Sequence, residues 1–139
     1  MAIKTKAYVD TSAFIAFFDK SDSHHILFRD LFQAPPPLCT SSLVIAEAHG
    51  WFLRRYDETR ALTFLAFLGE APPLEVRPFD HSELDKATRI LRKFADQKLT
   101  LADAHGLSIM KESRITDCWS TDGHLSLHGA KLATTRYMQ

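Results

Sequence analysis

The sequence predicts an α/β fold, a three-layer α/β/α sandwich in which helices cover both faces of a short central parallel sheet. Short apolar segments typical of buried strands alternate with longer segments of helical periodicity along the chain. Strands separated by helices pair in parallel, because each crossover returns the chain to the same end of the sheet. The length of 139 residues suits one core, so we assign residues 1–139 to a single domain.

Five strands are expected, each a short run of aliphatic or aromatic residues followed by a turn residue or a helix cap. The first ends in Asp10, and the segment "RITDCWST" forms the fourth. The expected strands are residues 6–10, 37–41, 74–79, 114–121 and 130–134.

The intervening segments carry helical signals, namely apolar residues at spacings of three and four and a hydroxyl residue before the first turn. Thr11 or Ser12 is the expected cap of the first helix, Ser41 or Ser42 that of the third, and Thr100 that of "KLTLADAHGLSIM". The expected helices are 12–18, 23–33, 42–56, 58–70, 81–96, the stretch 98–110 from Thr100 onwards, and a short helix near 123–128.

The charge balance is even, with 17 basic and 17 acidic residues, which argues against tight non-specific binding to nucleic acid but leaves a local basic patch open.

Cys39 and Cys118 lie in apolar, strand-like segments and are interpreted as buried thiols in a reducing compartment, with a disulfide as the less favoured alternative. No apolar run reaches the roughly 18 residues of a membrane span, and the N-terminus lacks a signal peptide's apolar stretch. A soluble cytoplasmic protein is therefore expected.

Four acidic residues stand in apolar surroundings, whereas most other carboxylates of the chain lie among charged residues. Asp10 and Asp122 follow the first and fourth predicted strands and would share the carboxyl edge of a parallel sheet. Glu47 and Asp103 lie on the apolar faces of two predicted helices, where an unpaired carboxylate is costly to bury. Together the four are expected to converge on one cleft.

Each of these acids also has an ordinary structural explanation. Asp10 could cap the helix after it, Asp122 could be a turn residue beside glycine, and the helix dipole favours an anion at Asp103. Glu47 could reach solvent or pair with an arginine of its own helix. If the four do converge, they require a cation, because neighbouring carboxylates raise one another's pKa, and Mg²⁺ or Mn²⁺ suits oxygen ligands.

The segments "VDTSAFIA", "SSLVIAEA", "LTLADA" and "STDGHL" occur in this order, and together they resemble the motifs of PIN-domain ribonucleases, most closely the VapC-like toxins of bacterial and archaeal toxin–antitoxin pairs. The resemblance implies metal-dependent hydrolysis of RNA phosphodiester bonds. Asp10 and Asp103 would be the most direct ligands of Mg²⁺ or Mn²⁺, and Glu47 and Asp122 would hold bound waters or a second ion. The resemblance also implies an antitoxin partner and a homodimer.

Further residues match the family's pattern. Hydroxyl residues accompany the first and last Asp in relatives, and Thr11, Ser12 and Thr121 fit those places. Asp96 fits the spacing of an Asp that recurs seven residues before the helical one, although a capping or surface role is the better interpretation. Gly123 stands where many relatives carry a larger residue.

Histidines follow three of the four acids at an offset of two residues. On a helix this offset points away from the acid, so His49 and His105 are expected to pack or to lie at the surface. His124 follows a turn instead and could reach a phosphate. The candidates for contact with an RNA backbone are Arg54, Arg55 and Lys98.

Other functions remain open at this point. A response-regulator receiver also gathers acids at strand ends, but it needs an adjacent acidic pair early in the chain, where only Asp10 is present. A haloacid-dehalogenase-type phosphatase needs a second Asp two residues after the first, where this chain has Ser12. A catalytically silent PIN-like module that binds a protein, or another RNA-processing nuclease, completes the alternatives.

Overall fold

The computed structural model describes residues 5–70 and 73–134, and the described residues form one five-stranded sheet in the order β3-β2-β1-β4-β5. Every neighbouring pair of strands in this sheet is parallel. The strands are β1 (Ala7–Val9), β2 (Leu38–Ser41), β3 (Leu74–Arg77), β4 (Asp117–Trp119) and β5 (Lys131–Leu132).

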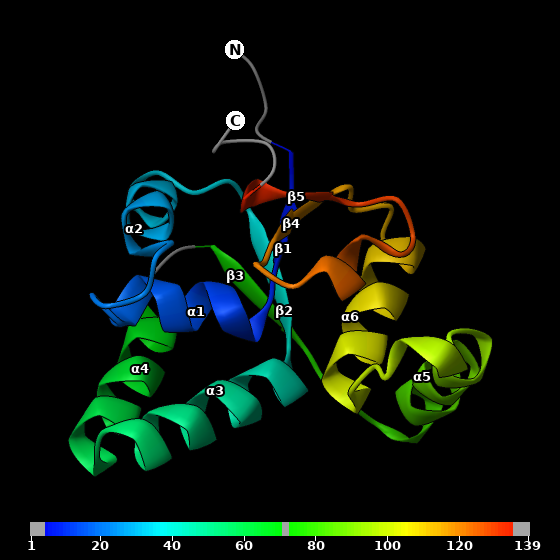
Figure 1. The fold of residues 1–139 in the computed structure, drawn as a ribbon, viewed down its shortest axis with the longest axis horizontal. Coiled ribbons are helices and arrows are strands. Elements are labelled where there is room, and N and C mark those ends of the chain that lie inside the picture. Colours follow the sequence, from blue (N-terminus) through cyan, green and yellow to red (C-terminus); the bar gives the residue numbers. More distant parts are fainter. Residues whose placement is uncertain (1–4, 71–72, 135–139) are drawn as a thin grey trace.

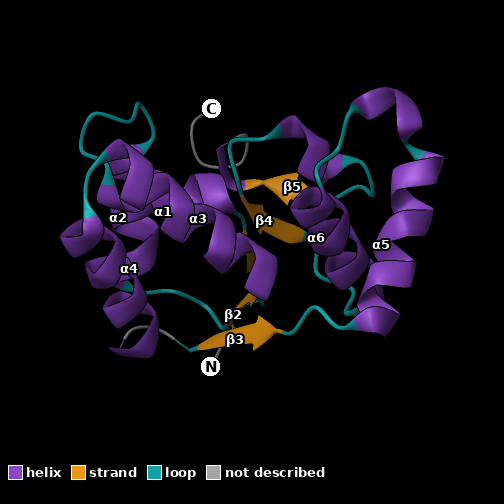
Figure 2. Cartoon of the chain, turned by 90° about the horizontal axis from the view of Figure 1, so that it is seen from below, coloured by secondary structure: helices purple, strands orange, loops and turns teal. Residues whose placement is uncertain are grey.

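Helices cover both faces of this sheet, so the predicted three-layer α/β/α fold is confirmed. The α-helices are α1 (Thr11–Phe18), α2 (His25–Gln33), α3 (Ser42–Arg55), α4 (Glu58–Glu70), α5 (His81–Lys93) and α6 (Leu101–Glu112). Helices α1 to α4 lie on one side, and α5 and α6 lie on the other (Figures 1 and 2). Among the described residues, no helix combines the length and apolar character needed to cross a membrane.

Several predicted boundaries differ from the structure, and two of them are wrong for clear local reasons. The predicted helix 81–96 ends at Lys93, and the 3₁₀ turn η1 (Ala95–Gln97) follows it as a separate element. The predicted strand 114–121 shrinks to the three residues of β4. Its first part belongs to the connection after α6, where Arg114 adopts a left-handed conformation with φ 53°.

The helix caps agree with two of the three expectations. Ser41 caps α3, since its hydroxyl accepts the Leu43 N–H, and Thr100 caps α6. The cap position of α1 is Asp10 rather than Thr11 or Ser12, and the Asp10 side chain makes no capping hydrogen bond. The Asp10 carboxylate is therefore left for another role.

The two cysteines are buried free thiols, as expected. Cys39 lies on β2 and Cys118 on β4, and Tyr8 of the intervening β1 pairs in register with both. Two strand spacings amount to about 9–10 Å, beyond the roughly 7 Å that a disulfide can bridge between Cα atoms. The disulfide alternative is therefore excluded.

Aromatic packing fixes the position of α1 beside the sheet. The buried ring of Phe14 meets Phe64 edge to face, with centroids 5.4 Å apart, and stacks with Phe32 at 5.9 Å. Phe32 in turn meets Trp119 of β4 at 4.9 Å. Because α1 begins directly after Asp10, this packing holds the Asp10 backbone against the end of β4.

Helix α6 approaches β1 closely at Gly106. A Cβ atom added there would lie 2.8 Å from the Tyr8 hydroxyl oxygen and 2.9 Å from the ring atom Cε1. Tyr8 is fully buried and cannot swing away. The glycine therefore sets the distance between α6, which carries Asp103, and the strand that leads to Asp10.

We expect Gly106→Ala to lower the free energy of unfolding by about 1–3 kcal/mol, because overpacking against Tyr8 outweighs the better helix propensity of alanine. Gly69→Ala is the matched control. It lies in α4 with no atom within 4 Å of its added Cβ, so it should be neutral or stabilising by up to about 1 kcal/mol. Urea unfolding of both variants measures the difference, and equal stabilities would contradict this account of the α6 contact.

Candidate functional site

The carboxyl ends of β1 and β4 bring the first acid of the site into place. These strands pair in parallel with Val9 opposite Trp119, and the Asp10 N–H donates to the Trp119 carbonyl at 3.0 Å. Asp10 is buried, with 5% of its surface exposed. The predicted shared edge for Asp10 and the segment after β4 is therefore confirmed.

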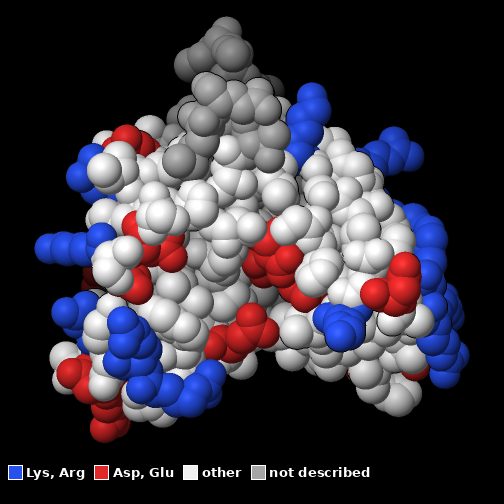
Figure 3. All heavy atoms as spheres, in the orientation of Figure 1, with Lys and Arg blue, Asp and Glu red and all other residues white. Residues whose placement is uncertain are grey.

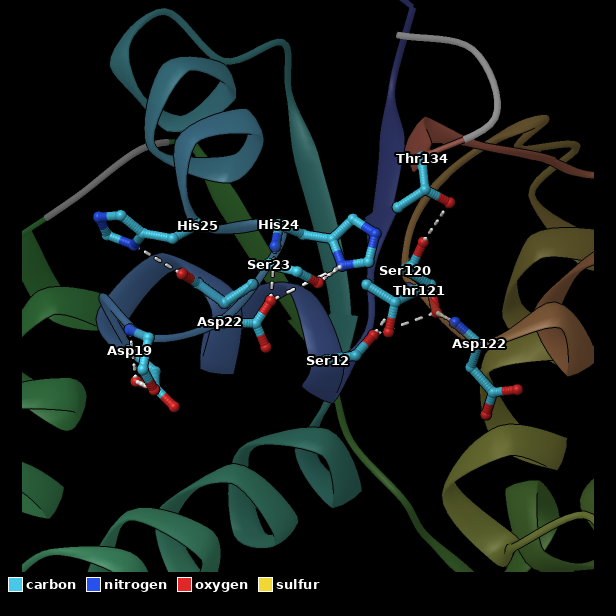
Figure 4. A network of polar contacts seen from close by, with 12 residues as sticks. Ser12, Asp19, Asp22, Ser23, His24, His25, Ser120, Thr121, Asp122 and Thr134 are labelled. Carbon is cyan, nitrogen blue, oxygen red and sulfur yellow. Dashed lines mark hydrogen bonds and ion pairs between the residues drawn. The ribbon is translucent and has the colours of Figure 1, made fainter. Parts of the chain in front are cut away.

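Two serine hydroxyls hold the Asp10 carboxylate. Ser120 donates to Oδ2 at 3.0 Å, and Ser12 donates to the same oxygen at 3.2 Å. Each serine oxygen also accepts a backbone N–H from the turn after β4, that of Thr121 for Ser12 and that of Asp122 for Ser120. Figure 4 shows Ser12, Ser120 and the Asp122 segment side by side. This hydroxyl network links Asp10 to the turn that carries Asp122.

Ser120 is a site residue that the sequence analysis missed. The predicted hydroxyl beside the last acid was Thr121, but Thr121 is exposed and joins the network through its backbone N–H. The available signal was position, since Ser120 directly follows the buried Trp119 at the end of a strand next to β1. Because Val9 pairs with Trp119, the residue that follows Trp119 must lie beside the end of β1.

The environment of Asp10 raises its pKa from 3.8 to about 6. Burial is the largest cause, the hydrogen bond from Ser120 acts in the opposite direction, and the negative charge of Asp103 adds to the rise. The negative charge of Asp103 thus acts on Asp10 across the space between them. A cation in that space would remove the repulsion.

We expect Ser120→Ala to raise the Asp10 pKa further, because the variant removes the hydrogen bond that lowers it most. The same change leaves the Asp122 N–H without its acceptor, so the free energy of unfolding should fall by about 1–2 kcal/mol. Carboxyl ¹³C NMR titration of the metal-free protein measures the pKa. Thr63→Ala is the control, because it removes an exposed hydroxyl contact in α4. An unchanged Asp10 titration in Ser120→Ala would contradict the proposed role of the hydroxyl.

Asp103 lies in the first turn of α6 and is buried, with 8% of its surface exposed. Its Oδ2 accepts the Thr100 N–H at 3.1 Å, and the Thr100 hydroxyl accepts the Asp103 N–H at 3.1 Å, which is a capping box. Asp103 therefore has a structural role at the start of α6, and one of its two carboxylate oxygens fulfils it. The cap does not use the second oxygen of the carboxylate, and the negative charge of Asp103 contributes to the raised pKa of Asp10.

Asp122 and His124 complete a group of close donor atoms with Asp103. Asp122 caps the 3₁₀ turn η2 (Gly123–Ser126), and its Oδ1 accepts the His124 N–H at 2.9 Å. The His124 Nδ1 atom lies 3.1 Å from the same oxygen. One ligand atom each from Asp103, Asp122 and His124 lie within 4.8 Å of one another, which suits a metal ion.

Glu47 departs from its prediction as an inward-facing acid, because its side chain is exposed. Helix α3 buries Val44, Ala48 and Phe52, and Glu47 is displaced from the centre of that face by about 100° around the helix. It does not belong to the close donor group, and neither does Asp10. The role that the resemblance implies for Glu47, to hold metal-bound water or a second ion, therefore stays a prediction.

The other candidate residues occupy varied places. Thr11 is buried beside Asp10, and its Oγ1 has no hydrogen-bond partner among the described residues. Asp96 is exposed in η1, and its side chain accepts a hydrogen bond from the neighbouring Gln97, which is consistent with a surface role. The proposed RNA-contacting residues Arg54, Arg55 and Lys98 are all exposed.

His105 is fully buried and packs away from the acids, as the offset from Asp103 predicts. Its Nδ1 lies 2.6 Å from the Ser41 hydroxyl, and its Nε2 lies 3.4 Å from Glu83 Oε2. Burial lowers the His105 pKa, so the ring is neutral near pH 7. This buried contact joins β2, α5 and α6 and lies outside the candidate site.

Acidic side chains gather at the centre of the face in Figure 3, around a hollow between the two groups of helices. Most lysine and arginine side chains lie toward the margins of the same face, and one basic group lies just to the right of the acidic centre. Oxygen and imidazole donors at this spacing fit a divalent cation, which would also offset the burial and the Asp103 charge that raise the pKa of Asp10. The arrangement can bind such an ion and present it to an anionic substrate.

Comparison with known proteins identifies similar folds. The PIN domain family model matches residues 7–129. VapC20 of Mycobacterium tuberculosis, described as a sarcin–ricin loop cleaving toxin, is 23% identical with a TM-score of 0.81, over 90% of this chain and 96% of that one. PAE2754 from Pyrobaculum aerophilum is 19% identical with a TM-score of 0.66, over 95% of this chain and 92% of that one. No curated protein matches the chain.

Proposed function

The chain belongs to the PIN domain family, and from this premise we propose that it is a metal-dependent endoribonuclease that hydrolyses RNA phosphodiester bonds. The observation that supports the proposal most directly is the close group of Asp103, Asp122 and His124 donor atoms beside the buried Asp10. Buried, mutually repelling carboxylates are costly in a structural role and useful around a cation.

The proposed cofactor is Mg²⁺ or Mn²⁺, held by Asp103 and Asp122 with Asp10 and Glu47 contributing around it. When bound, such an ion polarises a phosphodiester and makes water more acidic. The protein's own contribution is orientation. Thr100 fixes one Asp103 oxygen, and Ser12 and Ser120 fix one Asp10 oxygen, so each carboxylate is held in a set orientation.

We also propose that the protein is the toxin of a toxin–antitoxin pair, acting in the cytoplasm as a homodimer that an antitoxin holds inactive. The support is the similarity in fold to VapC20, which is itself described as a toxin. Exposed apolar side chains on α3 and α4 offer surface for such partners, among them Leu53, Leu62 and Leu65.

The alternative is a catalytically silent PIN-like module or an RNA-processing nuclease without a toxin role. All four acids are present, and the close donor group is intact, which favours an active enzyme over a silent module.

The test is cleavage of a mixed RNA pool that includes ribosomal RNA, with Mg²⁺, Mn²⁺ or EDTA. Asp10→Asn protein prepared in parallel controls for contaminating nuclease. Cleavage that requires the ion and leaves 5′-phosphate and 3′-hydroxyl ends supports the proposal. If no RNA in the pool is cut under any metal condition, the silent module becomes the better assignment.

A further inference from the structure

We propose that His124 is a nitrogen ligand of the metal site, and that its imidazole makes the site prefer transition-metal dications such as Mn²⁺ and Co²⁺ over Mg²⁺. The inference rests on the proposed function and refines it, since it concerns which ion the same site selects. It adds a ligand that the four-acid pattern of the sequence does not contain.

The position of the ring supports this assignment. A donor nitrogen of His124 lies within 4.8 Å of both carboxylate ligand atoms, those of Asp103 and Asp122. Two ligands of one ion, each about 2.1 Å from it, can be no more than about 4.2 Å apart. A small inward movement of the groups would therefore place all three donors on one ion.

The turn that carries His124 is built to hold the ring at this place. Asp122 Oδ1 accepts the His124 backbone N–H at 2.9 Å, and Ser120 accepts the Asp122 N–H at 2.8 Å. These bonds tie the His124 backbone to the end of β4 without any use of the imidazole. The ring is also 38% exposed, so burial of the side chain in the core does not explain its position.

A simple ion pair with Asp122 is the competing interpretation, because Nδ1 lies 3.1 Å from Asp122 Oδ1. That oxygen already accepts the backbone N–H, so the carboxylate does not depend on the ring for a partner. An ion pair would involve only these two groups, whereas the observed geometry also brings the ring close to Asp103. The third member of the group distinguishes metal ligation from a local contact.

The chemical consequence follows from ligand type. Mg²⁺ takes oxygen ligands and keeps much of its water, so an imidazole adds little to its binding. The first-row dications accept imidazole, with affinity that rises from Mn²⁺ through Co²⁺ to Cu²⁺. A site of two carboxylates and one imidazole should therefore select transition-metal ions, and loss of the imidazole should remove the preference.

The experiment compares the full chain with His124→Gln, whose amide keeps similar length and offers oxygen in place of nitrogen. His49→Gln is the matched control, since His49 also stands two residues after an acid, on α3, and lies outside the donor group. Co²⁺ binding is followed by its visible absorption spectrum, Mn²⁺ binding by electron paramagnetic resonance, and Mg²⁺ by competition. Circular dichroism confirms that each variant is folded.

We expect His124→Gln to weaken Co²⁺ and Mn²⁺ binding by about tenfold or more, to change the Co²⁺ spectrum, and to alter Mg²⁺ binding by less than about threefold. His49→Gln should match the parent. Equal Co²⁺ spectra and affinities in parent and His124→Gln would overturn the inference while leaving the proposed nuclease intact. Absence of any Mn²⁺, Co²⁺ or Mg²⁺ binding to the parent would overturn both.

Discussion

Asp103→Asn is expected to lower the rate of metal-dependent RNA cleavage by about 100-fold or more, while the protein keeps its fold. The substitution removes the charge that the cation requires at the centre of the donor group. It keeps a side-chain oxygen that can accept the Thr100 N–H, so the capping box survives. Initial cleavage rates with Mg²⁺ or Mn²⁺, together with thermal unfolding, measure the two effects separately.

Two further variants make the result specific. Asp96→Asn removes an exposed carboxylate seven residues earlier in the chain and should leave cleavage within about twofold of the parent. Asp103→Ala removes the charge and the cap together, so it should also lower the free energy of unfolding by about 1 kcal/mol. Retention of metal-dependent cleavage in Asp103→Asn would remove Asp103 from the catalytic site.

The fold was predictable because strands and helices alternate clearly in the sequence, and their parallel pairing follows from that alternation. The carboxyl-edge position of Asp10 was predictable for the same reason. Boundaries were less accurate where backbone conformation decides them. The left-handed residue Arg114, which lies in the connection between α6 and β4, carries no sequence signal that separates it from a strand residue.

The details of the site depend on where individual side chains point, which the hydrophobic periodicity of the sequence does not resolve. Glu47 was expected to face inward, but α3 buries a face centred about 100° away from it. Asp103 was expected either to sit where the helix dipole favours an anion or to face a cleft. It lies in the first turn of α6, and one of its two oxygens takes part in a capping box that was not expected. Ser120 could be recognised only once the register of β1 and β4 was known.

Asp10→Asn is expected to stabilise the metal-free protein by about 3 kcal/mol above pH 7, although it removes a residue of the proposed site. Burial and the charge of Asp103 raise the Asp10 pKa from 3.8 to about 6, while the hydroxyl of Ser120 limits the rise. Each pKa unit corresponds to about 1.4 kcal/mol, so ionising Asp10 in the folded, metal-free protein costs about 3 kcal/mol relative to the unfolded chain.

The direction of the pH dependence follows from the raised pKa. Below pH 3.8 the Asp10 carboxyl is protonated in both the folded and the unfolded states, so its favourable contribution to stability is fully present. Between pH 3.8 and about 6 the unfolded chain ionises first, and that contribution is lost as pH rises. The difference in unfolding free energy between Asp10→Asn and the parent should therefore grow from near zero at pH 4 to its full value at pH 7.

A divalent cation should reverse this order, since it binds the folded parent and compensates the Asp10 charge. In EDTA the variant should be the more stable protein, and in millimolar Mn²⁺ the parent should gain stability while the variant gains little. Urea unfolding at pH 4, 6 and 8, with and without Mn²⁺, tests both parts. Asp85→Asn, at an exposed position of α5, is the control for removal of one carboxylate outside the candidate site. A parent that is more stable than Asp10→Asn in EDTA at pH 8 would mean that the buried carboxylate is already compensated within the protein, and the case for a cation beside it would lose its electrostatic basis.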